Sequence, residues 1–473
     1  MNRFLLIVGF SCLLWGCSPS EDSGSEGAAN SVPSQKSDQT PTSPIVDTTP
    51  LSPQEYSDLV KQADQAITNA KYDEAVRLLT RAINGRPREA EAYLKRAALF
   101  AEAKLFPNAI ADMSVAVDLD PKNPRQLNTR GYFLLMTKQY GRAQQDFNDA
   151  IGLNLDYPQP YNNRGLVWLA QGDPGKAIKD FDNAIRVKPD YVDALNNRGF
   201  ALMQLDRNEE AVESLSDALE VDPDYLNAIT NRGRAHFKLG NYQASIDDFT
   251  HAIELRPEPL HYYAHRAEAY FASGQKELAK KDVDHVEWTQ ALTTLDLQIK
   301  QSPRNADLWT SRGKHLLERN RTAEAESSFA KALQLDPRHT PALIGRARLH
   351  ASQQDWPAVV SDCTAAIEAS GSFEAYTLRG DAYFESGDFE KAVTDYVQAR
   401  RFDDRVVAAY RNRARQYRSQ GKADLAAADE AYAQSLEHQL THALQRDSQA
   451  PPEMVIEQAS FETAESPDEK PTK

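Results

Sequence analysis

Between residues 55 and 445, small and large apolar side chains recur with a period of 34 residues. In the first six periods a small residue, a large apolar residue four positions later and an alanine three positions after that precede a proline, which Leu155 replaces once. The large apolar residues are Leu79, Met113, Phe147, Phe181, Leu215 and Phe249. Steps of three and four residues place these side chains on one face of a helix. The pattern therefore predicts a helix that ends near each proline.

The first half of each period predicts a second helix. It carries a small residue 24 positions before the proline: Ala63, Ala97, Gly131, Gly165, Gly199 or Gly233. Glycines between the halves, such as Gly172 and Gly240, can end a helix in a left-handed cap. Small residues let paired helices approach closely, and large ones fill the gaps between them. Each period is thus predicted to be a helical hairpin.

This order of small, aromatic, alanine and proline positions resembles the tetratricopeptide repeat over about four-fifths of the chain. The resemblance implies an all-α fold, a right-handed α-α superhelix (solenoid) of about 10–11 tetratricopeptide repeats. It also implies that the first helix of each repeat lines a concave groove that receives a peptide or a partner helix.

The phase of the repeat slips once and predicts two arrays. The N-terminal array, 51–287, has repeats beginning near 56, 90, 124, 158, 192, 226 and 260. About twelve extra residues then lie around 284–296. The C-terminal array, 288–445, has repeats beginning near 306, 340, 373 and 407. We expect a joint between the arrays.

Residues 1–16 have the features of an export signal, because Arg3 precedes an apolar stretch too short to span a bilayer comfortably. Leu14-Trp15-Gly16-Cys17 resembles a bacterial lipobox, although Trp15 is larger than usual there. The resemblance implies lipidation of Cys17, with palmitate as one acyl chain, and a lipoprotein anchored in the membrane. Ser18 is not the aspartate associated with inner-membrane retention, which favours the outer membrane, facing the periplasm. The alternative is a plain secretory signal peptide.

Two segments are expected to be disordered. Residues 17–50 are rich in Ser, Thr and Pro, and residues 446–473 are acidic and lack periodicity. Neither holds enough large apolar side chains to offset the entropy of ordering.

Charge and metal-binding residue types exclude several functions. The net charge of −15 argues against a nucleic-acid partner. Cys12, Cys17 and Cys363 have neither metal-ligand nor disulfide spacing, so we expect no cofactor. The pairs His261/His265 and His438/His442 have helical spacing but lack an evident third ligand, so no metal site is predicted. Cys363 occupies the slot of the large apolar residue, which predicts a buried, inert thiol.

An arginine precedes the small residue of the first helix in almost every repeat. The row consists of Arg96, Arg130, Arg164, Arg198, Arg232, Arg266, Arg312, Arg346, Arg379 and Arg413. An aspartate follows sixteen positions later, except at Ser214 and Ser328. Because acid and base recur together, we expect ion pairs within repeats rather than a ladder of anion sites.

The predicted groove face carries asparagines and adaptable apolar side chains. An amide both donates and accepts, which suits the backbone of an extended peptide. The candidate peptide-binding residues are Asn128, Asn162, Asn163, Asn196, Asn197, Phe200, Met203, Asn231 and Phe237. The alternative is that asparagine is a consensus residue here, with a local hydrogen bond.

The last repeats gather arginines in an otherwise acidic chain: Arg400, Arg401, Arg405, Arg411, Arg415 and Arg418. They could meet an acidic partner or the chain's own acidic tail. Alternatively they form the solvated face of a capping helix.

These features favour a non-catalytic adaptor or scaffold of the bacterial cell envelope that binds other proteins or peptides. The resemblance connects it with envelope-assembly or cell-wall machinery. A structural spacer or self-assembling component is the alternative. An enzyme or small-molecule receptor is less favoured, because no nucleophile–base grouping stands out.

Overall fold

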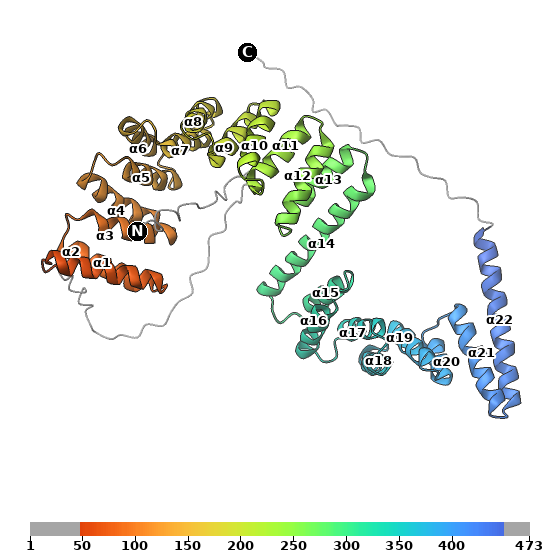
Figure 1. Ribbon diagram of the computed structural model, residues 1–473. Helices are drawn as coiled ribbons and strands as arrows, with labels where there is room; N and C mark the ends of the chain where they lie inside the picture. Colours follow the sequence, from red (N-terminus) through yellow and green to blue (C-terminus); the bar gives the residue numbers. More distant parts are fainter. Residues whose placement is uncertain (1–47, 449–473) are drawn as a thin grey trace, which may run out of the picture. The chain divides into compact units, whose positions relative to one another are not determined.

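The computed structural model describes residues 48–448, with side chains to residue 441, and this range forms 22 α-helices and no β-strand (Figure 1). The predicted all-α class is confirmed. The expected signal peptide, the lipidation site Cys17 and most of the 17–50 linker lie outside the described residues, as does the tail from residue 449. The tail was expected from residue 446, but the last helix continues to Ser448.

The chain divides into two compact units, Met1–Asn154 and Leu155–Lys473. The helices of the first unit are α1 (Pro53–Thr68), α2 (Tyr72–Gly85), α3 (Ala90–Glu102), α4 (Phe106–Leu119), α5 (Pro124–Met136) and α6 (Tyr140–Leu153). Those of the second are α7 (Pro158–Ala170), α8 (Pro174–Val187), α9 (Val192–Gln204), α10 (Asn208–Val221), α11 (Leu226–Lys238), α12 (Tyr242–Leu255), α13 (Leu260–Ala272), α14 (Lys276–Gln301), α15 (Ala306–Leu317), α16 (Thr322–Leu335), α17 (Thr340–Ser352), α18 (Trp356–Ser370), α19 (Phe373–Glu385), α20 (Phe389–Gln398), α21 (Asp404–Ser419) and α22 (Ala423–Ser448).

Each odd-numbered helix packs against the even-numbered helix that follows it. The 22 helices thus make eleven hairpins, in agreement with the predicted number of repeats. The slot of the large apolar residue lies at the centre of each hairpin. Phe147, Phe181, Leu215, Phe249 and Phe329 are all fully buried there.

The first helices need small residues because they touch the large apolar side chain that occupies this slot. A Cβ atom added at Gly165 would lie 2.5 Å from the ring of Phe181, and one at Gly199 would lie 2.5 Å from Leu215. Neither position has room for a methyl group, so helices of one hairpin approach as closely as the pattern predicted.

The turns within the hairpins are left-handed, with or without glycine. Gly172 and Gly240 have φ of 77° and 76°, which confirms the predicted caps. Lys138 and Asp206 occupy the same place with φ of 58° and 55°, although neither residue type indicates such a turn. The turn is therefore imposed by the hairpin, and glycine only lowers its cost.

The extra residues near 284–296 lengthen one helix. The helix α14 has 26 residues, whereas the sister second helix α12 has 14. The expected array boundary at 287/288 lies inside α14. The compact units divide at 154/155, where Leu155 replaces the repeated proline.

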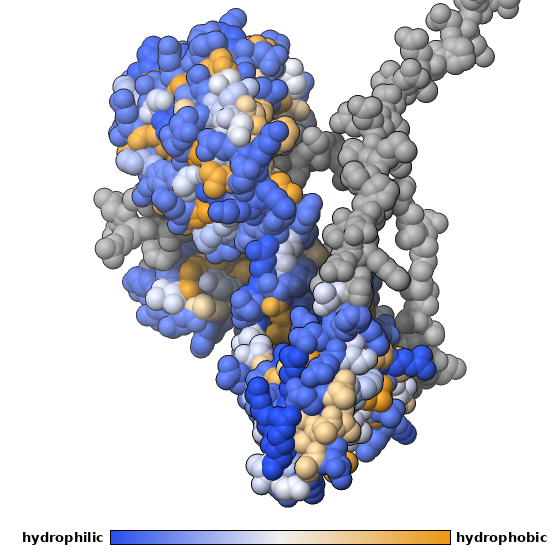
Figure 2. Space-filling model, turned by 90° about the vertical axis from the view of Figure 1, so that its right-hand side faces the viewer, coloured by the Kyte–Doolittle hydropathy of each residue, from blue (hydrophilic) through white to orange (hydrophobic). Residues whose placement is uncertain are grey.

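The face drawn in Figure 2 is largely hydrophilic. On this face, hydrophobic residues form small separate patches. Within residues 48–448, no helix is both long and apolar enough to cross a membrane.

The close approach of the paired helices predicts opposite effects for two glycine substitutions. Gly165→Ala forces a methyl group against Phe181, and overpacking of this kind costs about 1–3 kcal/mol. In contrast, Gly152→Ala places its methyl group in open space on α6 and gains up to about 1 kcal/mol of helix propensity. Urea midpoints of the two variants should therefore move in opposite directions. A stabilising Gly165→Ala would contradict the packing described here.

Candidate functional site

The first helices α7, α9, α11 and α13 of the second unit are successive neighbours. Most of the predicted binding residues lie on them: Asn162, Asn163, Asn196, Asn197, Phe200, Met203, Asn231 and Phe237. Asn128 lies on α5 in the first unit and is half-buried.

Asparagines join these neighbouring helices to one another. The Nδ2 of Asn197 donates to Oδ1 of Asn162 at 3.0 Å, and the Nδ2 of Asn231 donates to Oδ1 of Asn196 at 3.0 Å. Asn162 and Asn196 are buried. We call Asn162, Asn163, Asn196, Asn197 and Asn231 the asparagine ladder. The two bonds join consecutive first helices, so they are contacts between repeats rather than the local hydrogen bond that the sequence offered as the alternative.

The ladder ends at α11 for a reason visible in the sequence. Thr230 replaces the asparagine found at the positions of Asn162 and Asn196, and His265 stands where the next ladder residue would be. The ring of His265 instead stacks on Phe249, with centroids 5.3 Å apart, and its Nδ1 lies 3.2 Å from Oε2 of Glu268.

An apolar row runs along the same helices. It consists of Met203 on α9, Phe237 on α11 and Phe271 on α13, which follow one another at 34-residue steps. Met203 and Phe237 are half-buried, as is Phe200, while Phe271 is 66% exposed. Phe271 was not among the predicted residues, although the step from Phe237 would have found it.

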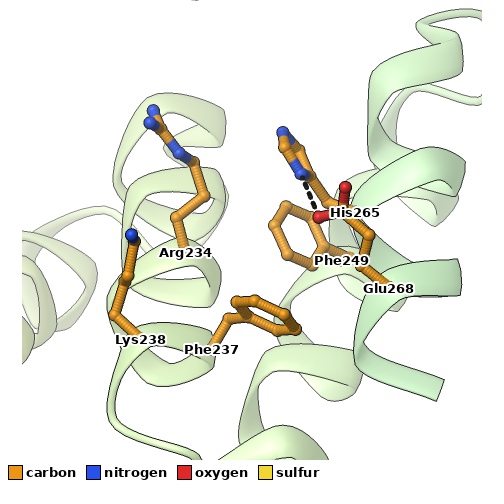
Figure 3. A pocket seen from close by; sticks show the side chains of 6 residues that line it. All are labelled: Arg234, Phe237, Lys238, Phe249, His265 and Glu268. Carbon is orange, nitrogen blue, oxygen red and sulfur yellow. Dashed lines mark hydrogen bonds and ion pairs between the residues drawn. The ribbon is translucent and has the colours of Figure 1, made fainter. Parts of the chain in front are cut away.

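A shallow recess of about 250 Å³ opens beside this row (Figure 3). It is lined by Arg234, Phe237, Lys238, Phe249, His265 and Glu268. Arg234 and Lys238 rise from α11 on one side, and His265 and Glu268 from α13 on the other. Phe237 and Phe249 lie between the two sides. The recess thus combines an apolar floor with a basic rim on α11.

The repeated arginines have structural partners, as expected. Eight of the ten bind the carboxylate sixteen residues later through two hydrogen bonds. In one of these pairs, Nε and Nη2 of Arg164 lie 2.8 and 2.6 Å from the oxygens of Asp180. The hydrogen bond to Asp180 raises the pKa of Arg164, so the guanidinium stays charged.

The two repeats without the aspartate use an acid on the other side. Arg198 pairs with Asp182 at 2.7 Å, and Arg312 pairs with Asp296 at 2.7 Å. Both acids lie sixteen residues before the arginine, on the preceding second helix. Asp296 comes from the elongated part of α14. The row is therefore neutralised in every one of these repeats.

The arginine cluster of the last repeats is also largely paired within the fold. Arg401 bonds to Asp381 and Asp403. Arg405 pairs with Glu385, Arg411 with Glu437 and Arg418 with Glu430. These contacts favour the capping role over a site for an acidic partner.

The surroundings of Cys363 and His261 shift the pKa values of their side chains. Cys363 is fully buried, and its burial raises the pKa of the thiol to about 12, so the reactive thiolate is scarce at neutral pH. Burial, and then His265, lowers the pKa of His261. Among the side chains that the structure describes, no three His, Cys, Asp or Glu residues gather as metal ligands.

Models of the tetratricopeptide repeat match this chain at residues 60–124, 158–191, 190–258, 277–340, 310–372 and 373–401. Together the matches cover more than half of the chain. A search of curated proteins finds no relative at significant similarity.

Three solved structures illustrate the likeness to known folds. MamA is 25% identical, with 36% of this chain and 93% of MamA covered and a TM-score of 0.34. The pilF protein of Pseudomonas aeruginosa is 20% identical, with 46% and 98% covered and a TM-score of 0.40. PilW, described as a widely conserved type IV pilus biogenesis factor, is 17% identical, with 44% and 96% covered and a TM-score of 0.40. None of these scores reaches 0.5, so no function follows from them.

Arg198 pairs with Asp182 rather than with the residue at position 214, and this predicts that a second substitution can restore lost stability. Asp182→Ser should destabilise the second unit by about 1 kcal/mol, a modest cost because the Asp182 side chain is 51% exposed. Adding Ser214→Asp supplies the carboxylate found at that place in sister repeats and should restore the urea midpoint. Further destabilisation in the double variant would show that the position of the acid is not interchangeable.

The asparagine ladder predicts a cost in stability. Asn197→Ala removes the donor to the buried oxygen of Asn162 and should destabilise the array by about 1–3 kcal/mol. Gln204→Ala, at an exposed position of α9, serves as the control. Amide hydrogen exchange in α7 and α9 should accelerate only in Asn197→Ala. Unchanged exchange there would leave the ladder amides with no structural role.

Proposed function

Because the chain belongs to the tetratricopeptide-repeat family, whose fold is generally a non-catalytic scaffold for protein–protein interaction, we propose that it is an adaptor whose first helices bind a segment of another protein. The binding surface is the face of α7, α9, α11 and α13 that carries Phe200 and the apolar row. The observation that carries the proposal is the contrast between this face and the rest of the repeated residues.

The contrast is between repeated polar side chains that have partners within the fold and apolar side chains that remain exposed. The arginine row is neutralised by carboxylates, and the asparagine ladder is bonded between helices. Phe271, however, is 66% exposed on α13, three residues after Glu268, which lines the same recess as Phe237. Exposed aromatic side chains next to a recess are typical anchors for a partner.

We therefore propose different roles for the predicted residues. Phe200, Met203 and Phe237 are proposed as contacts for the partner, together with Phe271. The ladder residues Asn162, Asn163, Asn196, Asn197 and Asn231 are proposed to shape the groove first, because those amides with a described bond hold neighbouring helices. Asn128 is proposed as a contact of the first unit.

The setting of the adaptor is proposed from the sequence alone. The lipobox-like Leu14-Trp15-Gly16-Cys17 supports a lipid anchor and a place in the cell envelope. The proposed partners are therefore proteins of envelope assembly or of cell-wall machinery. We also propose two arrays, 51–287 and 288–445, which α14 joins as a continuous helix.

Site-directed photo-crosslinking tests the binding face. The crosslinking residue p-benzoylphenylalanine replaces Phe200 or Phe271 in the full chain, and irradiation of intact cells traps whatever touches these positions. The matched control places it at exposed Glu213 on the second helix α10. We expect a discrete adduct from Phe200 and Phe271, and none from Glu213. Equal adducts at all three sites, or none at any, would contradict the proposal.

A further inference from the structure

We propose that the recess between α11 and α13 binds an internal acidic segment of the partner protein. An apolar side chain of that segment would lie against Phe237 and Phe249, and a side-chain carboxylate next to it would bind Arg234 and Lys238. This inference rests on the proposed function and specifies the chemical class of its ligand.

The basic rim consists of two neighbouring cations, Arg234 and Lys238, at one recess. Arg234 and Lys238 are exposed, four residues apart on α11, and point along the same side of the recess (Figure 3). Neither forms an ion pair within residues 48–441, whereas the arginine row and most of the C-terminal arginine cluster do. In a chain with a net charge of −15, two unneutralised cations at one recess select for an anionic ligand.

The opposite rim carries an acid, Glu268, which forms no ion pair with Arg234 or Lys238 among the side chains that the structure describes. The carboxylate of Glu268 is engaged by His265, with Nδ1 and Oε2 3.2 Å apart. The stacking of His265 on Phe249, at 5.3 Å, keeps both groups on the α13 side. An incoming carboxylate would therefore bind the cations on α11 and be repelled by Glu268 on α13, and this difference orients the ligand.

The size of the recess points to a side chain as its occupant. Its volume of about 250 Å³ is below the roughly 300–1,000 Å³ of typical small-molecule sites. Its floor is the half-buried Phe237 and the ring of Phe249, which is 1% exposed. One apolar side chain would cover the accessible part of this floor, which is mainly Phe237, and the chain that carries it would remain on the surface.

The apolar row explains why the ligand is an internal segment rather than a chain end. Met203 lies on α9, the first helix before the recess, and Phe271 lies on α13, which forms one wall of it, so apolar side chains follow Phe237 on both neighbouring first helices. Neighbouring packed helices are roughly 8–10 Å apart. Three residues of an extended polyproline-type segment rise about 9 Å. A ligand crossing the helices would thus present every third side chain to the row.

A synthetic peptide tests this specificity on the full chain. The probe is acetylated and amidated, with phenylalanine at every third position and glutamate beside the central one, and binding is measured by fluorescence anisotropy. We expect saturable binding, weakened at least about tenfold when glutamine replaces the glutamate. Such a loss is typical of a charge-assisted contact.

Charge-reversal variants locate the contact. Arg234→Glu with Lys238→Glu should weaken binding at least about tenfold. The control, Lys179→Glu with Lys300→Glu, makes the same change of net charge at exposed positions of α8 and α14 and should leave affinity within about twofold. Phe237→Ala should weaken both the glutamate and the glutamine peptide, with circular dichroism confirming that the helices persist.

Several outcomes would overturn the proposal while leaving the adaptor function intact. Equal affinity for the glutamine peptide would remove the acidic class. Binding only of a peptide with a free C-terminal carboxylate would identify a chain end as the ligand. Binding that requires deletion of residues 449–473 would show that the chain's own acidic tail occupies the recess. Equal losses of peptide affinity in the two pairs of charge-reversal variants would show that the effect comes from net charge alone.

One combination separates this proposal from its premise. If no peptide binds but Phe271 still gives a discrete crosslinked partner, the ligand class is wrong and the adaptor stands. If neither a peptide nor a partner binds at this face, both fail.

Discussion

A guanidinium held against the carboxylate of a second helix is the interaction on which the repeat stack depends. In most repeats the aspartate lies sixteen residues after the arginine, and it is almost fully buried, as at Asp146 and Asp180. Breaking such a pair leaves an uncompensated charge and costs several kcal/mol, although the pair itself adds little net stability. Each of these arginines must therefore be neutralised, and the acid that does so can come from the second helix on either side. Arg198 and Arg312 show this, because each lacks the usual aspartate and binds an acid sixteen residues before it.

The same constraint gives a reason for the register of α14. Asp296 lies in its elongated part and pairs with Arg312 of the next hairpin. The second half of α14 thus acts as the preceding second helix for α15. A longer helix restores the phase of the repeat without a separate linker.

The sequence predicted what depends on residue size and period. The hairpins, the buried Phe slot and the bidentate pairs all follow from spacing, because only a small residue fits beside Phe181 and only an acid neutralises Arg164. It did not predict features set by neighbouring helices. Lys138 takes a left-handed turn because the hairpin requires it, and Asn162 meets Asn197 only once the helices lie side by side. The 34-residue step from Phe237 leads to Phe271, but only the structure shows that its side chain is 66% exposed.

Once the residues with contacts inside the fold are set aside, fewer residues remain as candidates for binding a partner. Four of the asparagines that suggested contacts with a peptide backbone instead form hydrogen bonds between helices. The proposed binding face then consists of the apolar row and the recess, whose basic rim lies beside aromatic rings. We propose that the partner is selected through this short stretch of surface, while the paired arginine row serves the fold.

The division between structural charge and binding surface is tested most directly by a double-mutant cycle on Arg164 and Asp180. Amide hydrogen exchange in α7 and α8 of the full chain would be measured for Arg164→Gln, Asp180→Asn and the double variant. Each single change should accelerate exchange in both helices, and the double variant should be no worse than the worse single one, because the two groups act as a unit. Unchanged exchange in all three variants, together with loss of the crosslinked partner, would instead make the arginine row the binding site.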